Sequence, residues 1–195
     1  MKNLKSILAL SIVKIPFLVF VLLLGACKDK SATAQQSTSL SKVKTPAVDI
    51  HTAVVSGNVE ALKQHVAAGT NINEKDPYGG SSPLISAALF GKTEMAKILI
   101  DAGADVNQIN NDGSTALHTA AFFCRPEIVK LLLDKKADKT VKNKYNSTAY
   151  ESVSGTFKEV KPTYEMMEKM LGPMGLKLDF AYVEKTRPLI AKMLK

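Results

Sequence analysis

Apolar residues in the middle of the chain follow the spacing of short helices. Met95, Ile98 and Leu99 fall on one face of a helix, because the second and third of them follow the first by three and four residues. The stretch from Ile128 to Leu133 is apolar at similar spacings. Polar stretches with turn-forming pairs such as Asp112-Gly113 separate these runs. The pattern predicts short helices joined by polar loops.

This pattern repeats along the chain with a period of 33 to 34 residues. The position of His51 recurs at Ile85 and again at His118, spacings of 34 and 33 residues. A repeat of this length is one supersecondary unit that buries its apolar face only against its neighbours. The period therefore predicts a stack of similar units.

The repeat resembles the ankyrin repeat. The family signature Thr-Pro-Leu-His-x-Ala-Ala is divided between Ser82-Pro83-Leu84 and Thr115-Ala116-Leu117-His118-Thr119-Ala120-Ala121. Ser or Thr caps the first helix, and Pro fits its first turn because no hydrogen-bond donor is lost there. The resemblance implies an all-α ankyrin-repeat solenoid of about four helix-turn-helix units joined by β-hairpin loops. It places the repeats at residues 47–145 and a degenerate repeat and C-terminal cap at 146–195.

Two departures from the repeat concern positions where glycine is expected. Cys124 stands where Gly91 ends the first helix of the preceding unit, and Lys136 stands where Gly103 ends the second helix. A residue at these positions needs a positive φ, which glycine adopts at no steric cost. We therefore expect a strained left-handed residue or a rearranged loop at Lys136.

The pattern weakens after residue 146. Residues 155–161 look like an insertion, and 162–171 have the composition of a delayed outer helix. The segment that begins with Arg187-Pro188 is similar to the one that begins with Arg125-Pro126. We interpret residues 147–195 as a degenerate repeat followed by a half-repeat, because a solenoid needs an atypical unit to close its end.

The N-terminus has the organisation of an export signal. Residues 1–14 carry three lysines and no acid, the run from Ile15 to Leu24 is apolar, and small residues follow. The sequence Leu24-Gly25-Ala26-Cys27 resembles the lipobox of bacterial lipoproteins, which implies a signal peptide at residues 1–26 and lipid attachment at Cys27. Residues 27–46 are rich in Ser, Thr, Ala, Gln and Lys, which predicts a flexible tether.

We therefore expect an exported protein, lipid-anchored to the periplasmic face of the cell envelope. Lys28 follows the lipid-bearing cysteine where inner-membrane lipoproteins of enteric bacteria have Asp, which favours the outer membrane. The formal net charge is +8, of which three lysines lie in the leader, and the other charges are interspersed. This distribution argues against nucleic acid as a partner.

The candidate reactive residues point to structural roles. The resemblance implies that His51 and His118 tie neighbouring loops by hydrogen bonds, while His65 stands alone on an outer helix. No histidine pair has the spacing of a metal motif, so we expect neither a metal nor a cofactor. Cys124 is expected to be a buried, inert thiol. We find no catalytic motif and expect no enzyme activity.

The candidate partner-binding residues follow from the resemblance, since in ankyrin repeats the residues before the helix-ending glycine face the concave side. We expect about half of these concave residues to pack beneath a neighbouring hairpin. Hairpin-tip residues extend the surface. The concave candidates are Val55, Leu89, Phe90, Phe122 and Phe123, and the tip candidates are Tyr78, Gln108, Asn110, Asp112 and Tyr145.

The sequence predicts a non-catalytic protein-protein interaction module, tethered to a bacterial envelope membrane and bound to a protein partner that the sequence does not identify. One alternative is an immunity or inhibitor protein for an envelope or secreted enzyme. A second alternative is an enzyme or ligand-binding site in the C-terminal segment, around Tyr150, Tyr164 and Tyr182.

Overall fold

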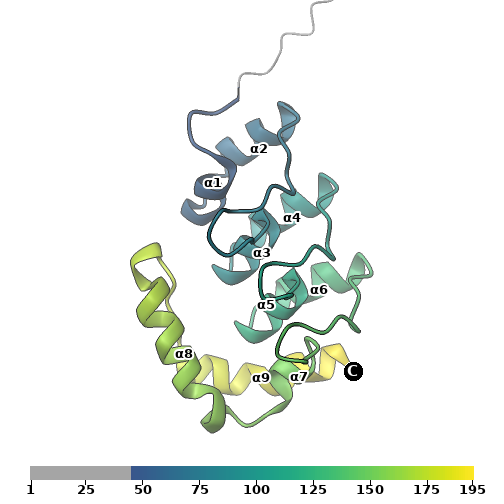
Figure 1. Ribbon diagram of the computed structural model, residues 1–195, viewed down its shortest axis with the longest axis vertical. Helices are drawn as coiled ribbons and strands as arrows, with labels where there is room; N and C mark the ends of the chain where they lie inside the picture. Colours follow the sequence, from purple (N-terminus) through teal and green to yellow (C-terminus); the bar gives the residue numbers. More distant parts are fainter. Residues whose placement is uncertain (1–44) are drawn as a thin grey trace, which may run out of the picture. The chain divides into compact units, whose positions relative to one another are not determined.

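The structure, a computed structural model, describes residues 45–195. The predicted signal peptide, Cys27 and most of the predicted tether lie outside the described residues. Helices arranged in pairs are stacked one pair on the next (Figure 1). Residues 45–195 contain no β-strand, which confirms the predicted all-α solenoid.

The first three units each consist of an inner helix of seven residues and an outer helix of nine. The inner helices are α1 (Ile50–Ser56), α3 (Pro83–Leu89) and α5 (Ala116–Phe122). The outer helices are α2 (Val59–Ala67), α4 (Thr93–Asp101) and α6 (Pro126–Asp134).

Side-chain caps fix where the inner helices begin. The Asp49 carboxylate accepts from the Thr52 N–H at the start of α1, and the Ser82 hydroxyl accepts from the Ile85 N–H at the start of α3. At α5, Thr115 is the N-cap and shares a reciprocal capping box with His118. Each cap satisfies a backbone donor that the helix leaves free, typically about 1 kcal/mol of stability.

The core runs continuously through the stack. Small side chains at Ala53, Ala87 and Ala120 are fully buried on the inner helices and let successive units approach closely. Leucines at one position of the outer helices, Leu99 and Leu132, are also fully buried. Burying a leucine contributes roughly 1.5–3 kcal/mol. Each unit thus obtains its stability from contact with the next.

The loops are hydrogen-bonded turns rather than β-hairpins with strands. In each loop one backbone pair closes the turn: Asp76 N–H to Ser81 O at 2.9 Å, Asn110 N–H to Ser114 O at 3.0 Å, and Asn143 N–H to Ser147 O at 3.0 Å. Neighbouring loops are also joined, through Asp105 N–H to Asn73 Oδ1 at 2.9 Å and Asp138 N–H to Asn107 Oδ1 at 2.8 Å. The second set forms a ladder along the loops.

The C-terminal segment completes a fourth unit and adds an insertion. The elements are α7 (Glu151–Ser154), α8 (Phe157–Leu171), the 3-10 turn η1 (Gly172–Met174) and α9 (Phe180–Leu194). Helix α9 packs against α6 and α7, so α7 and α9 form the inner and outer helices of this unit. Helix α8 and η1 intervene between them.

The expected delayed outer helix at 162–171 and the expected final half-repeat are therefore wrong. Residues 162–171 belong to the inserted α8, and α9 is the outer helix. Pro126 is at the first turn of α6. The corresponding Pro188 lies inside α9, because α9 begins at Phe180, about two helical turns earlier. The proline marks where the repeated part of this longer helix begins.

Cys124 and Lys136, which stand where the preceding unit has glycine, keep the left-handed backbone conformation of those glycines. Cys124 has φ 54° and Lys136 has φ 59°, close to φ 64° at Gly91 and φ 88° at Gly103. The left-handed conformation is thus retained with a side chain present, at a cost of about 1 kcal/mol or more per residue. The sequence-based expectation of a strained residue at Lys136 is confirmed.

We predict that Lys136→Gly stabilises the protein by about 0.5–1 kcal/mol, because glycine removes the strain of the left-handed backbone. Chemical denaturation of the full chain measures this difference. The matched control is Lys63→Gly in the interior of α2, an exposed lysine with helical φ, where the same change should destabilise by about 1 kcal/mol. Equal effects of the two substitutions would contradict strain at Lys136.

Candidate protein-binding surface

Three pairs of residues end the inner helices at equivalent positions: Val55-Ser56, Leu89-Phe90 and Phe122-Phe123. Val55, Leu89 and Phe90 are each half-buried. They are absent from the core cluster and from the partly buried hydrophobic side chains that pack against it. The first two units therefore present apolar side chains that the core does not use.

The third pair is covered by the insertion. Phe122 stacks on Tyr164 of α8 with ring centroids 4.5 Å apart and an interplanar angle of 25°. Phe123 is only 6% exposed and meets Phe122 edge-on. Both phenylalanines were partner-binding candidates in the sequence, and the structure instead buries Phe123 and half-buries Phe122 beneath α8. Three of the five concave candidates, Val55, Leu89 and Phe90, remain partly accessible at the first and second units.

The Tyr164 hydroxyl connects α8 to α5 and α9. It donates to the Phe122 carbonyl and accepts from Arg187 Nη1 at 2.8 Å, while Arg187 Nη2 donates to the Gly155 carbonyl at 3.2 Å. Burial raises the pKa of Tyr164 to about 12, against the effect of the Arg187 charge, so the hydroxyl keeps its proton. Tyr164, expected near a possible C-terminal ligand site, is instead a fully buried core residue.

Cys124 lies next to this network. Its side chain is fully buried, and Sγ is 3.6 Å from the Val183 carbonyl of α9. Burial raises the pKa of the Cys124 thiol to about 11. A thiol that is protonated and shielded at neutral pH is a poor nucleophile, as expected from the sequence.

The hairpin tips divide into structural and accessible residues. Asn110 Oδ1 accepts from the Asp112 and Ser114 N–H groups at 3.0 and 2.9 Å, and Gln108 Nε2 donates to Asn73 O at 2.9 Å. These two candidate side chains therefore hold loops in place. Tyr78 is 92% exposed and Tyr145 is 72% exposed. Together with the exposed Asp112 they are free to contact a partner.

His118 ties two units as expected. Its Nε2 is 3.0 Å from the Ser147 carbonyl of the next loop, and its Nδ1 is 2.9 Å from the Thr115 hydroxyl. The carbonyl can only accept, so Nε2 carries the proton and Nδ1 accepts from Thr115. Burial lowers the pKa of His118, although the Ser147 hydrogen bond opposes this effect. The neutral ring of His118 is therefore the form that satisfies both hydrogen bonds.

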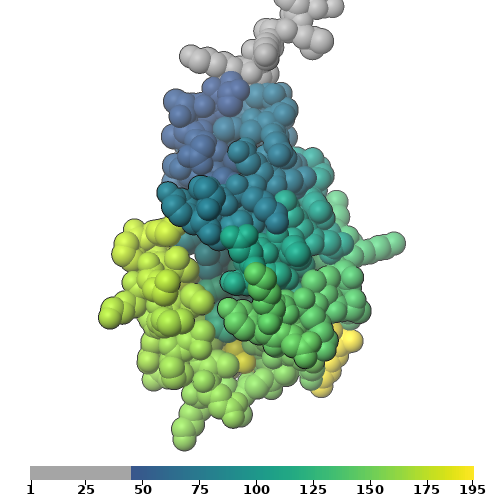
Figure 2. Space-filling model, viewed as in Figure 1, coloured from purple at the N-terminus to yellow at the C-terminus, as the bar shows by residue number. Residues whose placement is uncertain are grey.

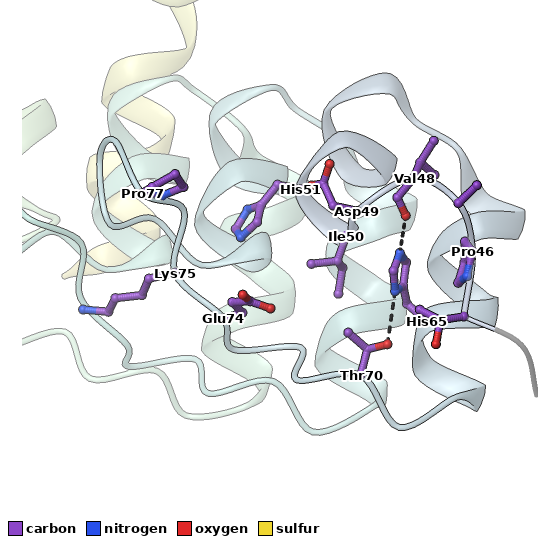
Figure 3. Close-up of a pocket in the computed structure, with 12 residues that line it drawn as sticks. Pro46, Val48, Asp49, Ile50, His51, His65, Thr70, Glu74, Lys75 and Pro77 are labelled. Atoms are coloured by element: carbon purple, nitrogen blue, oxygen red, sulfur yellow. Dashed lines mark hydrogen bonds between the residues drawn. The ribbon is translucent and has the colours of Figure 1, made fainter. Parts of the chain in front are cut away.

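The other two histidines line an open pocket of about 510 Å³ at the N-terminal end of the described residues (Figure 3). His65 bonds the Thr70 hydroxyl at 3.1 Å and the Val48 carbonyl at 2.8 Å, which holds the first residues onto α2. Both ring nitrogens of His51 are shielded and have no hydrogen-bond partner in the part of the chain that the structure describes. The expected loop tie at His51 is therefore wrong, because Val48 replaces the threonine that holds His118.

Both ring nitrogens of His65 are engaged in hydrogen bonds, and those of His51 are shielded. Within residues 45–195, no group of three or more His, Cys, Asp or Glu side chains is arranged to hold a metal ion. The same residues include no helix with the length and apolar character needed to cross a bilayer.

A family model described as ankyrin repeats matches residues 50–143 in three copies. Residues 50–143 are ankyrin repeats. The solved ankyrin repeat domain of Bcl-3, described as a unique member of the IkappaB family, is a structural neighbour with a TM-score of 0.51 and 32% sequence identity. That similarity covers 53% of this chain and 45% of the Bcl-3 chain.

Similar relatives share only the repeats. Protein phosphatase 1 regulatory subunit 12A of Mus musculus is 39% identical over 70 residues, which are 36% of this chain and 7% of the relative. Protein phosphatase 1 regulatory subunit 27 of Homo sapiens is 41% identical over 64 residues, 33% of this chain and 41% of that protein. The chain thus spans less than half the length of either relative, and the shared part is a protein-interaction repeat.

The ankyrin repeats of this chain differ from a regular stack in one respect that sequence reasoning missed. The side chains of Tyr164 and Arg187 close the third unit, although neither belongs to the repeat match at 50–143. The similarity of Arg187-Pro188 to Arg125-Pro126 was the available signal. This similarity identifies α9 as the outer helix of the fourth unit. The residues between α7 and α9 are therefore an insertion.

We predict that His118 makes the stability of the ankyrin repeats depend on pH. Its pKa in the folded protein is lowered from 6.5, so folding favours the neutral ring, and the stabilisation is lost as the pH falls below about 6.5. A proton on Nδ1 would also face the Thr115 N–H, donor against donor. Denaturant unfolding near pH 7.5 and near pH 5.5 measures the loss. His118→Gln, which cannot titrate, should lose less stability over this interval, and an equal loss would contradict the assignment.

Proposed function

We propose that this chain is a non-catalytic protein-binding module, tethered by a lipid on Cys27 to a bacterial cell envelope. The binding surface comprises Val55, Leu89 and Phe90 at the inner-helix ends, with Tyr78, Asp112 and Tyr145 at the hairpin tips. The observation that carries the proposal is the set of half-buried apolar side chains that the core leaves unused at matching positions of adjacent repeats.

Physical chemistry supports binding at this surface. Apolar side chains gathered at one place on a surface commonly mark an interaction site, and aromatic residues are enriched among the residues that dominate binding energy. Tyr78 and Tyr145 supply exposed aromatic area on loops that the hydrogen-bond ladder holds in place. Relatives named as regulatory subunits of a protein phosphatase contain similar repeats, which supports a role as a binding subunit.

The proposed tether rests on the sequence alone. An acyl chain contributes about 0.8 kcal/mol per buried methylene, so several chains on one cysteine hold a protein stably at a membrane. A tether of roughly 20 residues would let the repeats reach about 20–25 Å from the bilayer.

We predict that Cys27→Ser moves the protein from the membrane fraction to the soluble fraction and abolishes labelling by a radioactive fatty acid. The cause is loss of the only proposed site of lipid attachment. The control is Cys124→Ser, which removes the buried thiol and should leave both labelling and membrane fractionation unchanged. Continued labelling of Cys27→Ser would refute the lipid anchor.

We predict that Leu89→Lys combined with Phe90→Lys abolishes partner capture, because two lysines would be desolvated in an apolar contact. Crosslinked affinity capture from native membranes, with the full chain as bait, measures this loss. The matched control, Val48→Lys with Leu189→Lys, places the same change on exposed apolar residues outside the proposed surface, 38% and 57% exposed. Circular dichroism checks that both variants remain helical.

One protein captured by wild type and by the control, but not by the Leu89/Phe90 variant, supports the proposal. Identical captures by all three forms would refute a binding role for the inner-helix ends.

A further inference from the structure

Helix α8 covers the third unit but leaves the second open. In Figure 1, α8 begins beside the lower units and rises to the level of α3. Figure 2 shows a hollow between the lime-coloured atoms of this helix and the teal atoms of the repeats. Helix α8 therefore extends past the Phe122–Tyr164 contact and, in this view, reaches the level of the second unit.

The dimensions place an equivalent apolar contact at the second unit. Leu171 follows Tyr164 by seven residues, two helical turns, so it shares the same face of α8 about 10 Å further on. Neighbouring helices are about 8–10 Å apart, so one step along the stack is similar in length. Leu171 therefore lies on the face of α8 that bears Tyr164, about one repeat step further along the helix.

The second contact, however, is not closed. Leu89 and Phe90 on α3 and Met167 and Leu171 on α8 are all half-buried, and none of them packs against the core cluster. Two further side chains at this end of α8, Met166 and Met170, are 50% and 64% exposed. Methionine is flexible and polarizable, and it suits surfaces that adapt to a bound side chain. The side chains on both walls of the hollow are apolar and lie outside the core cluster.

A row of cations follows the same positions. Lys92 and Arg125 immediately precede the outer helices α4 and α6, and Arg187 holds the equivalent repeat position inside the longer α9. Lys92 and Arg125 each lie against the left-handed glycine of the preceding unit. A Cβ built on Gly57 would be 3.5 Å from Lys92 Nζ, and one built on Gly91 would be 2.9 Å from Arg125 Nε.

Only the last cation of this row has its partners within the insertion. Arg187 donates to the Tyr164 hydroxyl and to the Gly155 carbonyl. Lys92 and Arg125 take part in none of the ion pairs found among residues 45–195. The Nε atoms of Arg125 and Arg187 are both buried without a hydrogen bond, but Arg187 has acceptors for its two Nη atoms.

We propose that a segment of the partner protein that carries apolar side chains and carboxylates binds in the hollow between α8 and the second unit. It does for this unit what Tyr164 does for the third: an apolar side chain lies on Leu89 and Phe90, and an oxygen acceptor meets Arg125. Lys92 adds a second positive charge at the same edge, so the acceptor is a carboxylate rather than a neutral group. This inference rests on the proposed function and specifies the chemistry of its partner.

Two designed helical peptides with the same Leu and Phe face, one carrying Glu and the other Lys on the opposite face, test this proposal. Fluorescence anisotropy with the full chain in nonionic detergent measures their affinities. We expect the acidic peptide to bind at least about tenfold more tightly than the basic one, and more weakly as salt increases. Lys92→Gln with Arg125→Gln should weaken the acidic peptide by about tenfold or more.

The matched control is Lys63→Gln with Lys130→Gln, which removes the same charge from exposed positions on outer helices. It should leave the affinity for the acidic peptide within about twofold of wild type. Met167→Lys, on the α8 wall, should weaken binding as well. Equal binding of both peptides, binding of neither, or equal effects of the two glutamine variants would overturn the proposal.

Membrane capture separates this proposal from the function on which it rests. If Lys92→Gln with Arg125→Gln still captures the protein that the Leu89/Phe90 variant loses, the binding function stands and the acidic partner segment does not. If neither variant changes the capture, both proposals fail.

Discussion

The fold depends on one constraint: no unit of this chain contains a core of its own. Each pair of helices is too short to bury its apolar side chains by itself, so stability comes from the faces that successive pairs share. The alanines at Ala87 and Ala120 and the leucines at Leu99 and Leu132 meet this constraint by letting the pairs approach closely and fill the space between them. The loops then have the same spacing as the helices. Only this regular spacing allows the ladder of loop hydrogen bonds from Asn73 to Asp138.

The same constraint explains why the end of the stack is elaborate. Within residues 45–195 the fourth unit packs against another repeat on one side only, and its inner helix α7 has just four residues. A longer outer helix and the inserted α8 make up the missing contacts. The two Nη atoms of the buried Arg187 donate there to oxygens of α8 and its preceding turn, so the positive charge is held without a carboxylate. The insertion thus serves stability at the third unit and forms one wall of the surface at the second.

The sequence alone predicted the repeated part well, because it depends on residue types at a fixed period. The caps at Ser82 and Thr115, the positive φ at Lys136 and the buried thiol of Cys124 all followed from position within the repeat. The contact between Phe122 and Tyr164 did not follow, because it joins residues 42 positions apart through an insertion that has no counterpart in the other units. The sequence left open whether Phe122 or Phe123 is the more exposed, and the structure buries Phe123. The predicted hydrogen bonds of His51 were wrong for a different reason. His51 occupies the expected position in the repeat, but the threonine that orients His118 has no counterpart beside it.

The placement of the Tyr164 contact has a consequence for how such a chain can change over evolution. Tyr164 and Arg187 bind the insertion to the last two units and make no hydrogen bond to the first two. A duplication of the second unit would therefore find matching neighbours on both sides and leave the terminal contacts intact. It would also lengthen the open hollow by one step, with another apolar pair and another cation. Residues that reach a partner can thus be added or lost one unit at a time, while the part that secures the end of the chain stays unchanged.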